Sequence, residues 1–168
     1  PEYPFVDQRS YTPPEATPAA YLEMLDRSGM TYGVLVQVSV HGTDNRLMVK
    51  TLKANPQRLR GIAVVSPDVD SAELAILKDA GVVGLRLNVL YGGGIGFDAL
   101  ESYGAMAREL GWHLQFLVSA TDLPALAPRI AKANPGLAGL VVLAGSTRPL
   151  QDSMLEQLTY FSTLDPEN

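Results

Sequence analysis

Three apolar segments of the chain carry polar residues at alternate positions, and this alternation constrains the fold more than any other feature. The alternating residues are Gln37, Ser39 and His41 in YGVLVQVSVH, Arg86 and Asn88 in VVGLRLNV, and His113, Gln115 and Ser119 in WHLQFLVS. Side chains alternate between the two faces of a β-strand, so each segment predicts a strand with one polar face. We expect the interleaved residues to pack on helices: Val34, Val36, Val38, Val83, Leu85, Leu87, Leu114, Phe116 and Val118.

Predicted strands and helices alternate along the chain. Strands are expected at 32–40, 60–66, 82–89, 112–118 and 137–143, where β-branched and other apolar residues cluster. Helices are expected at 19–28, 45–55, 71–80, 99–110 and 122–133, with Thr17 and Ser71 as N-caps and Pro18 in the first turn. This alternation is typical of a parallel sheet with crossover helices.

Two parallel architectures fit that order, and the polar strand faces favour one of them. A doubly wound sheet is covered by helices on both sides, so its strands should be apolar on both faces. A (β/α)8 barrel can instead place polar side chains at the mouth of its interior. A complete barrel takes about 250 residues. We therefore predict an incomplete α/β barrel of five βα units that lacks its first strand and its last strands.

One domain is predicted for the whole chain. Residues 1–17 form an extended lead-in, 18–149 the βα units, and 150–168 an irregular or helical tail. The 168 residues are 46% hydrophobic and 18% charged, which suits a soluble globular domain. A net charge of −5 and a pI of about 4.9 argue against a nucleic-acid partner.

Targeting and redox features are sparse. The chain has no cysteine and no apolar stretch of about 20 residues, so disulfides and a membrane span are not expected. Its first ten residues lack the pattern of a secretory signal, and we predict a cytoplasmic location. Because the chain begins at Pro1 without Met, we expect it to be processed or a fragment.

Several segments resemble one enzyme family. The strings YPFVDQRSYTPPEAT, GVLVQVSVHGTDN, GIAVVSPDV, AGVVGLRLNVLYGGG and LGWHLQFLV are similar to the amidohydrolase-2 group of the amidohydrolase superfamily, in particular to 2-pyrone-4,6-dicarboxylate lactonase-like hydrolases. The resemblance implies a TIM-type barrel and hydrolysis of a carboxylated lactone or related ring ester by activated water. It also implies a divalent metal, such as zinc, in full-length members.

The resemblance also shows which family motifs this chain lacks. The family's His-x-His strand would precede residue 1, and its late Asp, the usual general base, would follow residue 168. The stretch VVLAGSTRP has Ala144 and Gly145 where members carry Asp-His, although Arg148 and Pro149 are kept. We therefore expect no metal site in this chain and assign no catalytic residue.

Substrate-binding roles follow from the resemblance position by position. The candidates are Tyr11, Thr12, Gln37, Ser39, Arg86, Asn88, His113 and Gln115. Arg86 resembles an arginine that grips a substrate carboxylate, and guanidinium groups suit that task because they bind carboxylates with two parallel hydrogen bonds. Three of these candidates also have a structural interpretation: Arg86 as part of an ion pair, and Gln37 and Ser39 as partners of backbone groups.

Two other functions remain open from the sequence. The chain could be a degenerate, non-catalytic barrel fragment, because the Asp-His pair is absent at Ala144 and Gly145. It could also be a module that binds a carboxylate without turnover. An open part-barrel leaves sheet edges unpaired, which would favour a homo-oligomer. The glycines at 92, 93, 94 and 96 predict a mobile loop at the top of the barrel rather than a nucleotide-binding motif, whose spacing they do not match.

Overall fold

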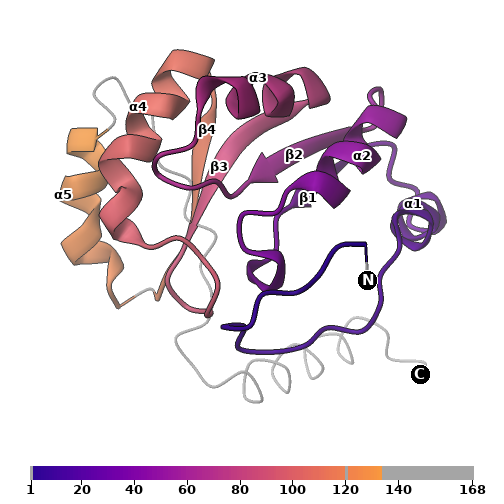
Figure 1. Cartoon of the computed structure of the whole chain (residues 1–168), viewed down its shortest axis with the longest axis horizontal. Coiled ribbons are helices and arrows are strands. Elements are labelled where there is room, and N and C mark those ends of the chain that lie inside the picture. The colour runs from indigo at the N-terminus through magenta and orange to yellow at the C-terminus, as the bar shows by residue number, and fades with distance from the viewer. Residues whose placement is uncertain (1, 120, 134–168) are drawn as a thin grey trace, which may run out of the picture.

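The computed structural model describes residues 2–119 and 121–133 (Figure 1). The strands are β1 (Gly33–Val36), β2 (Leu59–Ala63), β3 (Val82–Asn88) and β4 (His113–Leu117). The α-helices are α1 (Pro18–Arg27), α2 (Arg46–Ala54), α3 (Ser71–Ala80), α4 (Leu100–Leu110) and α5 (Leu123–Ala133), with short 3-10 helices η1 (Ser39–His41) and η2 (Phe97–Ala99). The fifth predicted strand, 137–143, lies outside the described residues, as do Ala144 and Gly145.

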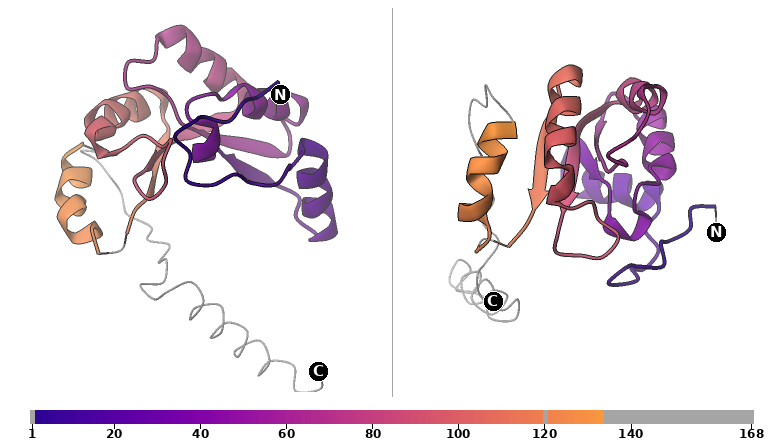
Figure 2. Two further views of the ribbon diagram at one scale, coloured as in Figure 1. Left: turned by 60° about the horizontal axis from the view of Figure 1, so that its bottom comes forward. Right: turned by 60° about the vertical axis from the view of Figure 1, so that its left-hand side comes forward.

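The sheet has the strand order of a barrel. All three strand pairs are parallel and the order is β1-β2-β3-β4, so each strand lies beside the next one in the chain. A doubly wound sheet would reverse its order at a switch point. Helices α2 to α5 follow one another around the outside of the curved sheet in the two further views (Figure 2). The described strands therefore form a consecutive part of a (β/α)8 barrel.

The hydrophobic core lies between the sheet and these outer helices. Its largest fully buried side chains are Leu52, Leu59, Val65, Leu77, Leu85, Leu87, Leu100 and Tyr103. The opposite face of β1 is open: Val34 there remains 52% exposed, and Val38, two residues after the strand ends, is 40% exposed. Within the described ranges, none of the helices combines the length and apolar character that crossing a membrane requires.

Helix starts follow local capping chemistry. The hydroxyl of Thr17 accepts a hydrogen bond from the backbone N–H of Ala20 at 3.2 Å, and Pro18 opens α1, as the sequence predicted. At α3 the predicted cap was wrong by one residue. Asp70, rather than Ser71, is the N-cap, and its carboxylate accepts from the N–H of Glu73 at 2.7 Å.

The predicted packing face of β1 was wrong. Leu35, not Val34, packs against the core, and Val36 pairs with Ile62 of β2 on the opposite face. The strand also ends at Val36 instead of continuing to residue 40. The run GVLV is apolar on both faces, so it does not indicate which face packs on the helices. The prediction therefore depended on Gln37, which was expected on the polar face. Its amide is instead buried and binds loop carbonyls.

A smaller correction concerns the start of β3. The pairing of β2 with β3 slips by one residue, because Gly61 is opposite Val82 whereas Ile62 is opposite Gly84. As a result Val82 joins the core, where the alternation had predicted Val83. The alternation is confirmed further along the sheet: Leu85 and Leu87 are fully buried, and Leu114 and Phe116 pack against the core.

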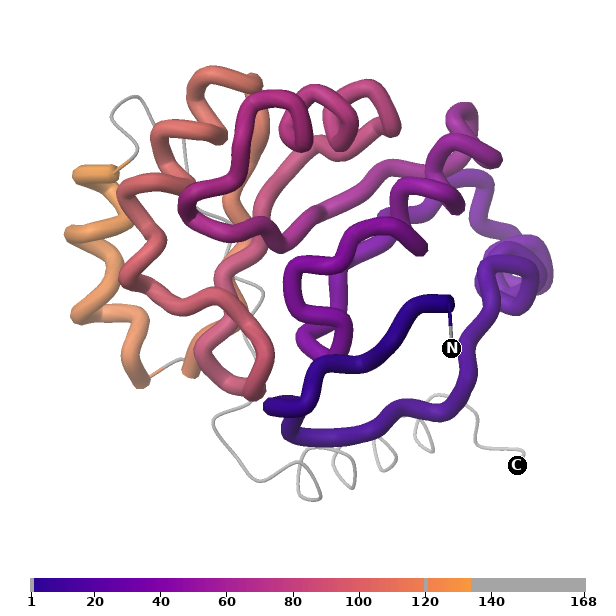
Figure 3. Tube along the Cα trace, viewed as in Figure 1, coloured from indigo at the N-terminus to yellow at the C-terminus, as the bar shows by residue number. Residues whose placement is uncertain are grey.

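The lead-in segment runs across the carboxyl ends of the strands (Figure 3). The N–H of Val6 donates to the carbonyl of Val40 at 2.8 Å, and the ring of Phe5 contacts that of His41 with centroids 5.0 Å apart. Further along, the segment touches the loop that follows β3. In a parallel barrel, the carboxyl ends of the strands are where ligands bind, so the lead-in borders the candidate site.

Candidate functional site

Arg86 and Gln115 form the centre of the candidate site. They are register partners on the adjacent strands β3 and β4, so their side chains share one face of the sheet, opposite the helix-packed face of Leu85 and Leu114. Both side chains are partly buried. The Nε of Arg86 and the Oε1 of Gln115 are buried atoms without a hydrogen-bond partner. Buried polar atoms are nearly always paired in folded proteins, so these two unpaired atoms make this face of the sheet a candidate place for a polar ligand.

The charge of Arg86 also lacks a partner among the described residues. Burial lowers the pKa of its guanidinium from the ordinary value, while Tyr11 and Tyr91 act in the opposite direction. Arg86 takes part in none of the ion pairs formed among residues 2–119 and 121–133. The predicted structural alternative, an ion pair with an aspartate of the chain, is therefore not found in the described part. A cation that has lost part of its hydration without gaining a counterion attracts an anionic ligand.

Two tyrosines lie near this guanidinium. The rings of Tyr11 and Tyr91 meet edge to face, with centroids 5.8 Å apart and an interplanar angle of 71°. The turn that carries Tyr91 is held by Asn88, whose Oδ1 accepts from the N–H groups of Leu90 at 3.0 Å and Tyr91 at 3.2 Å. Asn88 is almost fully buried. Its side chain therefore acts on the shape of the loop.

Other predicted site residues have structural partners. The Nε2 of Gln37 donates to the carbonyls of Asp44 at 2.8 Å and Gly42 at 3.3 Å, which fixes the loop before α2. Thr12 accepts from the Nε of Arg9 at 2.9 Å within the lead-in. Ser39 is buried in η1, where its carbonyl oxygen accepts from the N–H of Gly42 at 3.0 Å.

The two histidines do not meet. His113 opens β4, and its ring lies against Gly84, at the amino end of the strands and away from the carboxyl ends. His41 ends η1 beside Phe5. No group of three His, Cys, Asp or Glu side chains that could hold a metal ion exists in the described part of the chain. The donor set present there does not fit the divalent metal that the family resemblance implies.

Asp44 illustrates a structural carboxylate near the strand ends. Its Oδ1 accepts a hydrogen bond from the backbone N–H of Arg46 at 3.1 Å, and its Oδ2 lies 2.6 Å from the guanidinium of the same residue. The hydrogen bond to the Arg46 side chain lowers the pKa of this carboxyl. Such a group stays ionised and paired at neutral pH, which suits a stabilising role at the start of α2 and not that of a general base.

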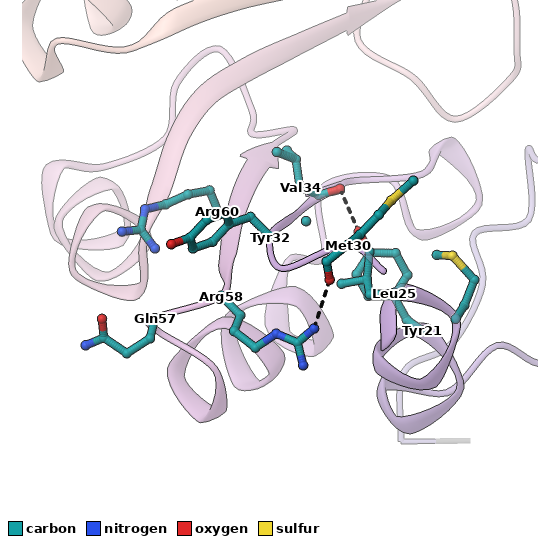
Figure 4. Close-up of a pocket in the computed structure, with 10 residues that line it drawn as sticks. Tyr21, Leu25, Met30, Tyr32, Val34, Gln57, Arg58 and Arg60 are labelled. Atoms are coloured by element: carbon teal, nitrogen blue, oxygen red, sulfur yellow. Dashed lines mark hydrogen bonds between the residues drawn. The ribbon is translucent and has the colours of Figure 1, made fainter. Parts of the chain in front are cut away.

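A separate pocket of the described residues lies elsewhere. It has a volume of about 650 Å³ and is lined by α1 and by the amino ends of β1 and β2 (Figure 4). Tyr21, Met30, Tyr32 and Arg58 border it, and Arg58 there bonds to the carbonyl of Met30 and to Asp26. This position is at the opposite end of the strands from Arg86, so we do not assign it to the ligand.

Sequence reasoning missed the contact between the lead-in and the glycine loop. The N–H of Gly92 donates to the Oγ of Ser10 at 2.7 Å, a bond between residues 82 positions apart. Gly92 and Gly93 also lie against the backbone of Gln8 and Ser39, contacts that the prediction of a glycine loop at the top of the barrel did not include. No local pattern signals such a pairing, because neither segment is periodic.

Comparisons with known proteins agree with this geometry. The amidohydrolase family model matches residues 1–142. The chain is 39% identical over 128 residues to 2-pyrone-4,6-dicarboxylate hydrolase of Comamonas testosteroni, covering 74% of this chain and 42% of the relative. It is 31% identical over 170 residues to 4-sulfomuconolactone hydrolase of Rhizobium radiobacter, covering 97% of this chain and 56% of the relative.

A solved structure shares the fold. The crystal structure of a probable 2-pyrone-4,6-dicarboxylic acid hydrolase of Acinetobacter baumannii, with citric acid bound, matches with a TM-score of 0.68 and 33% identity, covering 78% of this chain and 50% of that one. The chain thus spans about half the length of the relatives it matches. The family match, the parallel strand order and these relatives agree: the chain belongs to the amidohydrolase family and forms part of its (β/α)8 barrel.

Proposed function

We propose that this chain supplies the carboxylate-binding side of a hydrolase site for a carboxylated lactone, such as 2-pyrone-4,6-dicarboxylate or a related ring ester. The observation that carries the proposal is the buried, unpartnered Nε of Arg86 beside the equally unpartnered Oε1 of Gln115. The relatives named as hydrolases of a pyrone dicarboxylate and of a sulfomuconolactone support it, because both names describe anionic lactones.

The chemistry of the two side chains fits a carboxylate. Nε and one terminal nitrogen of a guanidinium match the two oxygens of a carboxylate, and such bidentate pairs are strong because both partners are charged. Half a turn of the Gln115 amide exchanges its oxygen for an NH2 donor, which can then reach the same anion. Binding would give the Nε of Arg86 an acceptor and the rotated NH2 group of Gln115 another, so ligand affinity should depend strongly on Arg86.

Hydrolysis itself needs a group that activates water. Amidohydrolase superfamily members typically depend on a metal for this, and a bound divalent ion lowers the pKa of its water. The residues of this chain that the structure describes do not fit such an ion. We therefore propose that Arg86 and Gln115 bind and orient the substrate, while water activation depends on residues beyond the described part.

Isothermal titration calorimetry with 2-pyrone-4,6-dicarboxylate tests the proposal. We expect the chain to bind this probe, and Arg86→Gln to weaken binding at least tenfold, because it removes a partly desolvated charge. The control is Arg60→Gln, since Arg60 is an exposed arginine on β2 that bonds to the carbonyls of Pro56 and Leu59. Equal losses in both variants, or no binding by the unmodified chain, would refute the assignment.

A second assay with the same pyrone separates an enzyme from a binding module. Ring opening of the pyrone, followed by its ultraviolet absorbance, would demonstrate turnover by this chain. Binding without ring opening would show that the chain retains the substrate subsite alone. We also propose a cytoplasmic location and self-association of the chain. Sedimentation velocity across a range of concentrations tests the self-association.

A further inference from the structure

Two tyrosine rings from distant parts of the chain converge, and both interact electrostatically with Arg86. Tyr11 belongs to the lead-in and Tyr91 to the loop after β3, and their centroids are 5.8 Å apart. The residues are 42% and 47% exposed, so each ring keeps surface that a ligand can cover. Exposed aromatic rings beside a half-buried cation form a surface with both an apolar and a charged component.

A hydrogen bond between the neighbours of these two residues holds them in place. Ser10 precedes Tyr11, Gly92 follows Tyr91, and the N–H of Gly92 donates to the Oγ of Ser10 at 2.7 Å. On its other side, Tyr91 is tied to β3 by its own N–H, which donates to the Oδ1 of Asn88 at 3.2 Å. The ring pair is thus anchored both to the lead-in and to the strand that carries Arg86.

The loop glycines allow this arrangement by their lack of a side chain. A Cβ on Gly92 would collide with the backbone carbonyl oxygen of Gln8, and one on Gly93 would lie 2.5 Å from the carbonyl oxygen of Ser39. Backbone atoms cannot rotate away as side-chain tips can, so the lead-in would have to shift. Gly96 of the same loop is different, since its nearest neighbour would be Val89 at 3.9 Å.

We propose that Tyr91, held against Tyr11 by the bond between Ser10 and Gly92, determines specificity by selecting flat, conjugated ring carboxylates over puckered saturated ones. The inference rests on the proposed function, in which Arg86 binds the carboxylate. A carboxylate conjugated to an unsaturated ring lies close to the ring plane, so the anion can meet the guanidinium while the ring face covers a tyrosine. A puckered ring presents axial hydrogens instead and loses that contact.

Two non-hydrolysable probes isolate this effect. Isophthalate and cis-cyclohexane-1,3-dicarboxylate carry carboxylates at equivalent ring positions, but only isophthalate is flat. We expect the unmodified chain to bind isophthalate roughly three- to tenfold more tightly in calorimetric titrations. Tyr91→Leu should bring the ratio close to one, because the loss of affinity should be larger for isophthalate than for the saturated probe. Tyr32→Leu, which changes a tyrosine that is 72% exposed beside the distant pocket, is the matched control.

The positioning residues are tested by the same ratio. Ser10→Ala and Gly92→Ala should both lower the preference for isophthalate, because they loosen or displace the lead-in, whereas Gly96→Ala should retain it. A ratio is not altered by a general loss of folded protein, so it reports on the rings themselves. Circular dichroism spectra of the variants confirm that the compared proteins are folded.

The outcomes separate the two proposals. Equal affinity of the unmodified chain for both probes would overturn the role of Tyr91 and leave Arg86 as a carboxylate site. An undiminished preference in Tyr91→Leu would overturn it as well. Absence of binding to either probe would remove the carboxylate site and the specificity inference together.

Discussion

Replacing Tyr103 by phenylalanine removes one buried oxygen that satisfies two backbone groups. The Tyr103 hydroxyl donates to the carbonyl of Val65 at 2.6 Å and accepts from the N–H of the same residue at 3.0 Å. Tyr103 and Val65 are both 0% exposed. The variant loses two hydrogen bonds of about 0.5–1.5 kcal/mol each and leaves a buried donor and acceptor unpaired, so we expect a total loss of about 2–4 kcal/mol.

Urea unfolding followed by circular dichroism measures this change. The midpoint should fall while the slope stays constant, because the substitution does not alter the surface exposed on unfolding. Tyr21→Phe is the matched control. Its hydroxyl makes a long, exposed hydrogen bond of 3.4 Å to the carbonyl of Val34, so the free energy of unfolding should change by no more than about 0.5 kcal/mol. A loss below about 0.5 kcal/mol for Tyr103→Phe, or equal losses for both variants, would refute the reasoning.

The same hydroxyl makes a pH-dependent contribution. Burial raises the pKa of Tyr103 from 10.0 to about 12, although its hydrogen bond with Val65 acts in the opposite direction. Between these values the folded state keeps a proton that the unfolded state releases. The stabilisation is therefore complete below pH 10 and is lost as the pH rises towards 12, by at most about 2–3 kcal/mol. Tyr103→Phe should lack this component of the alkaline loss.

Two further substitutions test structural assignments. Asp70→Ala removes the N-cap of α3 and should cost about 1 kcal/mol in urea unfolding, whereas Ser71→Ala should be nearly neutral; the reverse order would restore Ser71 as the cap. Gln37→Leu leaves the carbonyls of Asp44 and Gly42 without their donor and should cost about 1–3 kcal/mol, with unchanged affinity for 2-pyrone-4,6-dicarboxylate; lost affinity at full stability would instead place Gln37 against the ligand.

Much of the described fold was predictable because its determinants are local. Strands, helices and the Thr17 cap follow from side-chain periodicity and capping chemistry, which operate over a few neighbouring residues. Arg86 and Gln115 were also identifiable, since each interrupts an apolar strand with a polar side chain at an alternate position. Their approach on one face of the sheet needed the register of β3 and β4, which alternation within a single strand does not specify.

Gln37 shows how the same pattern can mislead. Its alternation with Ser39 resembled that of Arg86 with Asn88, yet its amide turns to the carbonyls of a loop. Both strands contain a polar residue among apolar neighbours, and a sequence does not record whether such a residue finds a backbone partner. Only the folded chain, in which Gly42 and Asp44 lie against the residue that follows β1, decides that Gln37 is satisfied while the Nε of Arg86 has no partner among the described residues.

The sequence by itself determined the parallel α/β plan, the family and the polar residues of the strands, because these depend on periodicity and on short motifs. Tertiary structure alone decided which polar atoms stay unpaired and which distant segments touch. The bond from Gly92 to Ser10 and the ring contact of Tyr11 with Tyr91 each span about 80 residues of chain. Such contacts depend on the pairing of β1, β2 and β3, since nothing in either local segment favours the other until the strands between them have aligned.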